Sequence, residues 1–261
     1  MSGPLHAPAP SIRLYFAYGN NLCLKEMARR CPSSVYIGRA VLPDHYWHIN
    51  QRGVANIVRR AGFAAHGLVY EIGVEDEIRL DKSEGVHYGH CSKTYQHVNL
   101  YSASKALQMP TRWLVERGGP KQVIKDARDL LIPIDARRER VLSSVLVYLN
   151  ERLVRYGQAG DDYIDQMNYG IRDAITLGVP PTYFKNVVRR WIPKGETVHN
   201  TVQRWNQHSL AHYQLPKLST TCLYRPRNRW SAAGESRYSD PKHDDDWKYR
   251  TPDIVIEVRR Y

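Results

Sequence analysis

Two short stretches of the chain carry the side chains best suited to chemistry, and the first is the run from Tyr15 to Leu22. A strand-like sequence enters Gly19, Asn20 and Asn21 and continues into a segment of helical composition. Glycine and asparagine accept the backbone conformations of sharp turns. Backbone N–H groups left free at such a turn can bind an anion or a developing oxyanion. An ordinary strand-to-helix turn has the same pattern and stays open as the alternative.

The second stretch, Leu80 to Val86, places Glu84 at the end of a predicted amphipathic helix. Glu84 precedes Gly85 and is framed by apolar residues. A carboxyl group that is shielded from water has a raised pKa and can exchange protons near neutral pH, as a general acid or base does. A solvent-exposed glutamate at a helix end is the alternative interpretation, since most glutamates are exposed.

The other polar motifs give weaker indications. His87, His90 and Cys91 are residue types that bind zinc, but no second ligand cluster accompanies them, so we expect no metal site. The run Ser102 to Lys105 has the S-x-x-K pattern of some acyl enzymes without their S-D-N and K-T-G elements, and we treat it as chance. The four cysteines form no C-x-x-C pair, and no N-x-[ST] acceptor occurs, which favours a reducing, cytoplasmic location.

Composition restricts the class of protein further. The 261 residues include 38 Lys and Arg against 26 Asp and Glu, a net charge of +12 that favours anionic partners. No apolar run approaches the length of a membrane span, and the first ten residues lack the apolar core of a secretory signal. Residues 224–230 interleave basic and aromatic side chains, but no nucleic-acid-binding motif supports them. We therefore expect no membrane span and no nucleic-acid partner.

Patterning predicts a mixed succession of strands and helices. Strands are expected at 12–18, 54–59, 66–72 and 94–101. Residues 35–49 contain two apolar stretches with an expected turn between them at Pro43 and Asp44, and a strand or short helix is expected at 141–150. Helices are expected at 22–30, 75–85, 121–131, 161–177 and 182–191. Strands come mostly first and do not alternate regularly with helices. This order favours the α+β class, with a small mixed β-barrel and surrounding helices, over a doubly wound parallel sheet.

Changes in composition divide the chain into three parts. Residues 1–11 contain several prolines and are expected to be a flexible N-terminal arm. Residues 12–193 form the predicted domain, in which 102–141 differ in character and are interpreted as an insertion. Residues 194–261 are polar with scattered tryptophans, and one strand is expected there at 254–258. We expect this C-terminal extension to pack on the domain rather than to form a core of its own.

The order and spacing of the motifs resemble the γ-glutamylcyclotransferase family. The run from Tyr15 is similar to the Y-F-A-Y-G-S-N motif that opens the family, and Leu80 to Val86 matches L-D-x-x-E-G-V. Further similar segments are the second strand region at 39–50, G-x-A-x-I at 53–57, the W-G-V-x-Y region at 66–72, the late helix at 162–171 and the G-L-P helix entry at 177–183. The resemblance covers 12–101 and 142–192, and several motifs in register are more specific than any single one.

This resemblance implies a fold, a reaction and a set of site residues. The fold is a small mixed barrel with helices around it. The reaction is cyclisation of a γ-glutamyl group to 5-oxoproline with release of an amine, a lyase step in glutathione metabolism that uses no metal or organic cofactor. The expected catalytic residue is Glu84, and the expected substrate-binding residues are Tyr18, Gly19, Asn20, Asn21, Leu22 and Tyr163. The substrate's own α-amine is the nucleophile, so the chain needs none.

The chain departs from the family pattern at several positions. Asn20 stands where the family loop has serine, and Cys91 stands where a tyrosine usually follows the E-G-V-x-x-G stretch. The insertion and the extension are additional. We expect the catalytic machinery to be kept and the substrate, a small γ-glutamyl peptide or amide, to differ. A specialised enzyme acting on a glutathione-derived secondary-metabolite intermediate and a non-catalytic binding module on the same fold are the alternatives, and a homodimer is left open.

Overall fold

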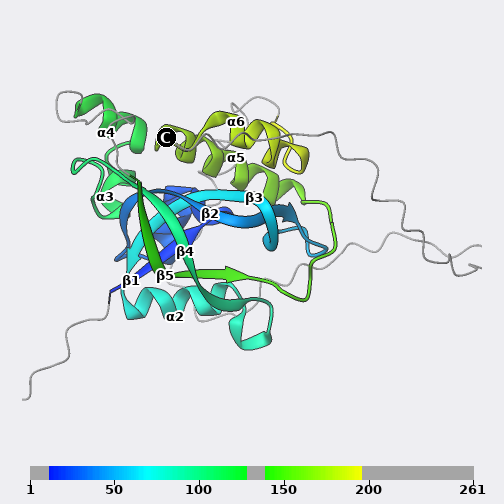
Figure 1. The fold of residues 1–261 in the computed structure, drawn as a ribbon. Helices are drawn as coiled ribbons and strands as arrows, with labels where there is room; N and C mark the ends of the chain where they lie inside the picture. Colours follow the sequence, from blue (N-terminus) through cyan, green and yellow to red (C-terminus); the bar gives the residue numbers. More distant parts are fainter. Residues whose placement is uncertain (1–11, 128–138, 196–261) are drawn as a thin grey trace, which may run out of the picture. The chain divides into compact units, whose positions relative to one another are not determined.

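The computed structural model describes residues 12–127 and 139–195 (Figure 1). The predicted N-terminal arm, the C-terminal extension beyond residue 195 with its expected strand at 254–258, and the last part of the helix predicted at 121–131 lie outside the described residues. The described part contains all the residues predicted for the site.

Five strands form one mixed sheet. They are β1 (Arg13–Ala17), β2 (Val35–Ile49), β3 (Ala55–Ile72), β4 (Ser92–Ser102) and β5 (Glu139–Leu149). Their order is β1-β3-β2-β4-β5, and the sheet closes as a barrel where β1 meets β5. The β1–β5 contact is parallel and pairs Tyr15 with Leu146, whereas the other neighbouring strands are antiparallel. Because β1 is short, the chain leaves the sheet soon after entering it, and the loop that follows lies at its end.

Helices lie around this sheet. In chain order they are η1 (Asn20–Leu22), α1 (Leu24–Arg30), α2 (Val74–Ser83), η2 (Val86–Tyr88), α3 (Thr111–Glu116), α4 (Pro120–Asp126), α5 (Asp161–Thr176), α6 (Pro181–Asn186) and η5 (Val188–Arg190). Figure 1 shows α5 and α6 on one side of the sheet and α2 on the other. The predicted α+β class, with a mixed sheet and helices around it, is confirmed. Within the described ranges, none of the helices has the length and apolar character needed to cross a membrane.

The core lies inside the curved sheet and under the helices that cover it. Side chains on a strand point alternately to its two faces, and the burial of β2 follows this alternation over its first half, whereas the last five residues of β5 are all buried. Fully buried members of the core include Phe16, Tyr36, Leu42, Trp47, Leu68, Tyr70, Val145 and Val147. Burying each large apolar side chain contributes about 1.5–3 kcal/mol, so these residues hold the end of β1 rigidly in place.

Two predicted interruptions do not end their strands. The turn expected at Pro43 and Asp44 is an irregularity within β2, where Asp44 has a φ of 55° and the ladder resumes at His45. The strands expected at 54–59 and 66–72 are both part of β3, whose residues 60–63 lie opposite Asp44. The Asp44 side chain accepts a hydrogen bond from the N–H of Gly62 at 3.1 Å. A bulge absorbs extra residues without ending the pairing, which is why one long hairpin forms.

Other boundaries shift by a few residues. The segment 141–150, predicted as strand or short helix, is strand up to Leu149 and belongs to β5, which begins at Glu139. The predicted insertion 102–141 therefore includes the last residue of β4 and the first residues of β5, and its described part carries α3 and α4. The helix expected at 182–191 is divided into α6 and η5.

Candidate functional site

Glu84 lies where α2 ends, as predicted. Its N–H donates to the carbonyl oxygen of Leu80 at 2.8 Å, and Gly85 follows in the left-handed conformation with a φ of 67°. A Cβ at Gly85 would lie 2.6 Å from Nδ1 of His90, so the chain folds back tightly at this point. The turn returns Cys91 to the helix end, where its thiol donates a long hydrogen bond to Glu84, with 4.0 Å between Sγ and Oε2.

The surroundings of Glu84 favour proton exchange. Burial raises the pKa of its carboxyl above the ordinary 4.5, while the positive charges of Arg30 and Arg52 act in the opposite direction without cancelling the effect. Nη1 of Arg30 lies 3.8 Å from Oε1 of Glu84. The glutamate side chain keeps 25% of its surface exposed, so a substrate can reach it. A reachable carboxyl group with a raised pKa has the properties of a general acid–base catalyst.

Three tyrosines lie within the field of this carboxylate. Burial, with a contribution from Glu84, raises the pKa of Tyr15, Tyr18 and Tyr163, so all three hydroxyls stay protonated. Tyr18 donates its proton to the carbonyl oxygen of Tyr148 at 2.6 Å. Tyr163 accepts a hydrogen bond from the N–H of Ala55 at 2.8 Å. Its own proton is therefore still available for donation.

The loop from Tyr18 to Leu22 follows β1 and turns at once into η1. The N–H of Leu22 donates to the carbonyl oxygen of Gly19 at 2.9 Å, and the Leu22 side chain is buried in the core. Leu22 thus fixes the loop and has no N–H left for a ligand. Asn20 and Asn21 occupy the first positions of η1, where backbone N–H groups have no acceptor within the helix. These two amides are the loop groups best placed to bind an anion.

The two asparagine side chains are partly engaged. Nδ2 of Asn20 donates to Gln166 at 2.9 Å, and Nδ2 of Asn21 donates to the hydroxyl of Tyr15 at 2.8 Å. Within 12–127 and 139–195, neither Oδ1 atom has a hydrogen-bond partner although both are buried. Buried polar atoms are normally paired, so two unpaired acceptors in this loop are unusual.

Helix α5 holds this loop from behind. A Cβ at Gly170 would lie 2.9 Å from Cβ of Leu22 and 3.0 Å from the backbone nitrogen of Cys23, so only glycine allows the helix to approach this closely. Asp173, one turn further on, accepts a hydrogen bond from the N–H of Leu24 at 2.9 Å. Pattern reasoning predicted the helix but did not identify either contact, because both depend on which elements pack together.

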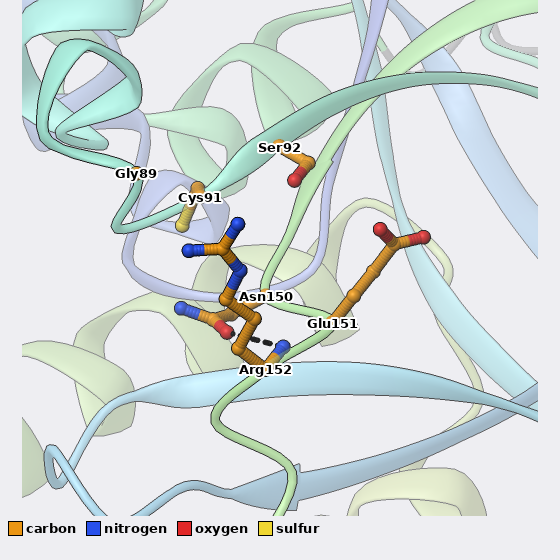
Figure 2. A pocket seen from close by; sticks show the side chains of 6 residues that line it. All are labelled: Gly89, Cys91, Ser92, Asn150, Glu151 and Arg152. Atoms are coloured by element: carbon orange, nitrogen blue, oxygen red, sulfur yellow. Dashed lines mark hydrogen bonds between the residues drawn. The ribbon is translucent and has the colours of Figure 1, made fainter.

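Cys91, whose thiol contacts Glu84, lines a pocket (Figure 2). The pocket has a volume of about 140 Å³ and is lined by two segments, residues 89–92 and residues 150–152. The lining side chains are Cys91, Ser92, Asn150, Glu151 and Arg152, together with the backbone of Gly89. Figure 2 shows the Arg152 side chain reaching toward Cys91. None of the residues from 150 to 152 is among the site residues expected from the sequence.

Two turns, one in this pocket and one that presents Arg52, share a short pattern in the sequence. The triplet Asn-x-Arg occurs as Asn50 to Arg52 and as Asn150 to Arg152. In each, the asparagine Oδ1 accepts the N–H of the arginine, at 3.0 Å and 2.9 Å respectively. Asparagine side chains stabilise turns in this way. The repeated triplet therefore presents an arginine at a rigid turn in both places, and Arg52 acts electrostatically on Glu84.

The absence of a metal site stays a prediction from the sequence. Across the residues that the structure describes, no group of three or more His, Cys, Asp or Glu side chains is close enough to hold a metal ion. His87 and His90 are both exposed, and the ring of His90 lies against Gly85.

Comparisons with known proteins agree with the resemblance in the motifs. The chain is 34% identical over 89 residues to the curated protein Gamma-glutamylcyclotransferase of Bos taurus, an alignment that spans 29% of this chain and 46% of that protein. A solved structure titled "Gamma-glutamyl cyclotransferase" covers 76% of this chain and 99% of its own, with a TM-score of 0.50 and 18% identity. A Homo sapiens protein described as uncharacterized, loc79017, has a TM-score of 0.48 and 19% identity. No protein-family model matches.

The sequence similarity covers part of the chain, and the structural similarity concerns the fold. The alignment spans about half the length of the bovine protein, and the structural likeness at 18% identity concerns the fold. The bovine relative and the solved structure are named for the same activity. The resemblance to the γ-glutamylcyclotransferase family predicted from the motifs is thereby confirmed, in sequence through the bovine relative and in fold through the solved structure.

Proposed function

We propose that this chain is a γ-glutamylcyclotransferase-like enzyme that cyclises the γ-glutamyl group of a small peptide or amide to 5-oxoproline and releases the amine. The observation that carries the proposal is the position of Glu84: its carboxyl has a raised pKa, contacts the pocket residue Cys91 and acts electrostatically on the tyrosines beside the loop. The motifs at both places resemble the family, and the bovine relative is named for this activity.

In the proposed reaction the α-amine of the substrate attacks its own γ-carbonyl carbon. A ring C–N bond forms and the C–N bond to the leaving amine breaks. Glu84 takes a proton from the α-ammonium group and returns one to the leaving nitrogen, so the carboxylate is regenerated and no electrons are exchanged. The ring nitrogen loses a second proton, which the released amine takes up to become an ammonium ion. A raised pKa makes the protonated form of Glu84 accessible, as the second transfer requires. Folding the substrate into its cyclising shape supplies a further entropic advantage.

The developing negative charge on the γ-carbonyl oxygen needs a donor. The backbone N–H groups of Asn20 and Asn21 are proposed for this task, with the Tyr163 hydroxyl as a neighbouring donor. The unpaired Oδ1 atoms of both asparagines suit the substrate ammonium. Asn20 then takes the place of the family's serine by offering an acceptor, although its side-chain nitrogen is already bonded to Gln166.

The size of the pocket bears on the alternatives. About 140 Å³ is below the range of roughly 300–1,000 Å³ typical of sites for drug-sized ligands. A pocket of this size accommodates a small leaving amine, and the large glutathione-derived intermediate stays the alternative. A non-catalytic module would have no need for a carboxyl with a raised pKa at the centre of the site. Cys23, Cys31 and Cys91 are free thiols, in keeping with the proposed cytoplasmic location.

The test is the variant Glu84→Gln, with Glu75→Gln as its control. Both glutamates belong to the α2 region, but Glu75 is exposed in the first turn of the helix. Glutamine keeps the shape of glutamate and cannot carry the proton. We expect turnover to 5-oxoproline to fall by about 10²–10⁴-fold or more at Glu84, with little change in KM, and to stay near that of the parent at Glu75.

The folding control is a thermal unfolding curve for each variant. Burial disfavours the charged form of Glu84, so removing that charge is expected to leave the stability unchanged or increased at neutral pH. A Glu84→Gln protein that is folded and turns over γ-glutamyl substrates within about tenfold of the parent would contradict the assignment.

A further inference from the structure

The pocket beside Cys91 is separate from the loop that follows β1. Its lining comes from residues 89–92 and 150–152 and includes none of the residues 18–22. Both regions meet at Glu84: Cys91 donates to its Oε2 atom, and Tyr18 and Tyr163 lie in its field. A cyclising substrate has two halves on either side of the bond that breaks. With the loop assigned to the γ-glutamyl half, the pocket is the space left for the amine half.

The pocket is held in shape by one buried side chain. Nδ2 of Asn150 donates to the carbonyl oxygen of His90, and its Oδ1 accepts the N–H groups of Arg152 and Leu153 at 2.9 Å and 2.6 Å. Its backbone is paired in both directions with the side chain of Asn56, at 2.9 Å for each bond. Asn150 thus joins the two segments of the lining, and the turn that carries Arg152 is rigid before any ligand arrives.

The charges of the pocket are those of Arg152 and Glu151. Among the described residues, no ion pair within 4 Å involves the guanidinium of Arg152, which Figure 2 places on the Cys91 side. The Glu151 side chain runs apart from it in the same view, and both residues are exposed to solvent. A guanidinium group on a preformed turn can bind a carboxylate through two parallel hydrogen bonds.

We infer that Arg152 determines specificity for the amine half of the substrate by binding a carboxylate that this half carries. The inference rests on the proposed function and deepens it: the substrates favoured are γ-glutamyl compounds whose leaving amine is small and anionic. A neutral amine half forms no ion pair with Arg152, and a cationic one is repelled by it. Ser92, across the pocket, adds a hydroxyl donor for the same group.

The experiment compares two substrates that differ only in this charge, γ-glutamyl-glycine and γ-glutamyl-glycinamide. Release of 5-oxoproline is measured as kcat/KM for the parent and for Arg152→Gln. We expect the parent to prefer the carboxylate. The variant should lose about tenfold on γ-glutamyl-glycine, the scale of a partly exposed charge-assisted contact, and change less than about twofold on the amide.

Two further variants make the test specific. Arg155→Gln removes an exposed arginine three residues away that does not line the pocket, and it should leave the preference unchanged. Glu151→Gln removes the one negative charge of the lining and should maintain or increase the preference for the carboxylate. A decrease caused by Glu151→Gln, or an equal loss in Arg155→Gln and Arg152→Gln, would contradict the role of Arg152.

Failure of the inference is distinguishable from failure of the proposed function. If the parent releases 5-oxoproline from both substrates and Arg152→Gln alters both equally or neither, the role of Arg152 is overturned and the cyclisation stands. If the folded parent releases none from any γ-glutamyl compound, the proposed function falls and the inference falls with it. A thermal unfolding curve for each variant confirms that the fold is retained.

Discussion

Nη1 of Arg30, at the end of α1, lies 3.8 Å from Oε1 of Glu84, just beyond the end of α2. The same guanidinium is shared with Glu26, whose Oε2 lies 3.7 Å from Nε of Arg30. Arg30 therefore connects the end of one helix to the end of the other. Its positive charge opposes the effect of burial on the Glu84 carboxyl, so the pKa of that group depends on the pairing.

The first prediction concerns the pH dependence of activity. A general base works when deprotonated, so kcat/KM should rise with pH as Glu84 loses its proton, with a midpoint above 4.5. Replacing Arg30 by methionine removes the charge that lowers this pKa, and the midpoint should move to higher pH. The measurement is the pH profile of 5-oxoproline release. Arg29→Met is the control, because Arg29 pairs with Glu26 alone in the described part and its side chain is 65% exposed.

The second prediction concerns stability and Asp173. Burial raises the pKa of this carboxyl from 3.8 to about 6. The folded protein thus holds a proton that the unfolded chain releases, so this contribution favours folding below pH 4 and is lost as the pH rises through 6. Asp173→Asn keeps an oxygen for the N–H of Leu24 and removes the charge. It should stabilise the protein above pH 6 by up to about 3 kcal/mol, measured as the free energy of unfolding.

A second buried group, His66, also makes stability depend on pH. The quantity to measure is therefore the difference in the free energy of unfolding between the parent and Asp173→Asn. Burial lowers the pKa of His66 from 6.5 to about 4, so its contribution is lost as the pH falls and has the opposite sign in the same range. The total slope of stability against pH combines both groups, whereas subtracting the Asp173→Asn curve from that of the parent isolates Asp173. A difference that stays constant between pH 4 and 7 would refute the assignment.

The third prediction concerns the close approach of α5 to the loop. In an ordinary helix, alanine is more stable than glycine by about 1 kcal/mol. At Gly170 the added methyl group would meet the backbone nitrogen of Cys23 at 3.0 Å, so the loop must shift. Gly170→Ala should therefore destabilise the protein by about 1–3 kcal/mol and raise KM for γ-glutamyl substrates. In Gly160→Ala, at the start of the same helix, the methyl meets nothing within 4 Å, and KM should not change.

Local patterns were sufficient for much of the fold. The start of β1, the end of α2 at Glu84 and the start of α5 follow from hydrophobic periodicity and from glycine punctuation, which act within a few residues. The continuity of β2 and β3 did not follow, since it depends on pairing between the strands across Asp44. Proline and polar residues normally indicate a turn, and here the long ladder overrides them.

The residues of the candidate site also divide into those that a local pattern indicates and those that depend on packing. Glu84 and the loop after β1 can be proposed from the sequence because each is one continuous motif. Arg30, Asn150 and Arg152 were missed because they become neighbours of Glu84 or Cys91 only after the helices and the sheet have packed. Leu22 was assigned to ligand binding, although its N–H is bonded to Gly19 and its side chain is in the core. Which amides of a turn remain free depends on the conformation of that turn.

The last prediction concerns Cys91, which stands where the family usually has tyrosine. Its thiol lines the pocket and contacts Glu84, and burial with the nearby carboxylate raises its pKa to about 12. At neutral pH the thiol is therefore protonated and a poor nucleophile. Cysteine is much smaller than tyrosine, so its presence leaves space at the inner end of the pocket.

In Cys91→Tyr the phenol should occupy this space, since a pocket of about 140 Å³ offers little room for both the phenol ring and a bulky amine. We expect kcat/KM to fall about tenfold or more for γ-glutamyl compounds with bulky amines, and less for γ-glutamyl-glycine, because the smallest amine needs the least space. Cys91→Ser is the matched control: it keeps the small size and should preserve the order of preference. The measurement is 5-oxoproline release over amines of increasing size. An equal loss for all amines in Cys91→Tyr would indicate disturbance of Glu84 rather than filling of the pocket.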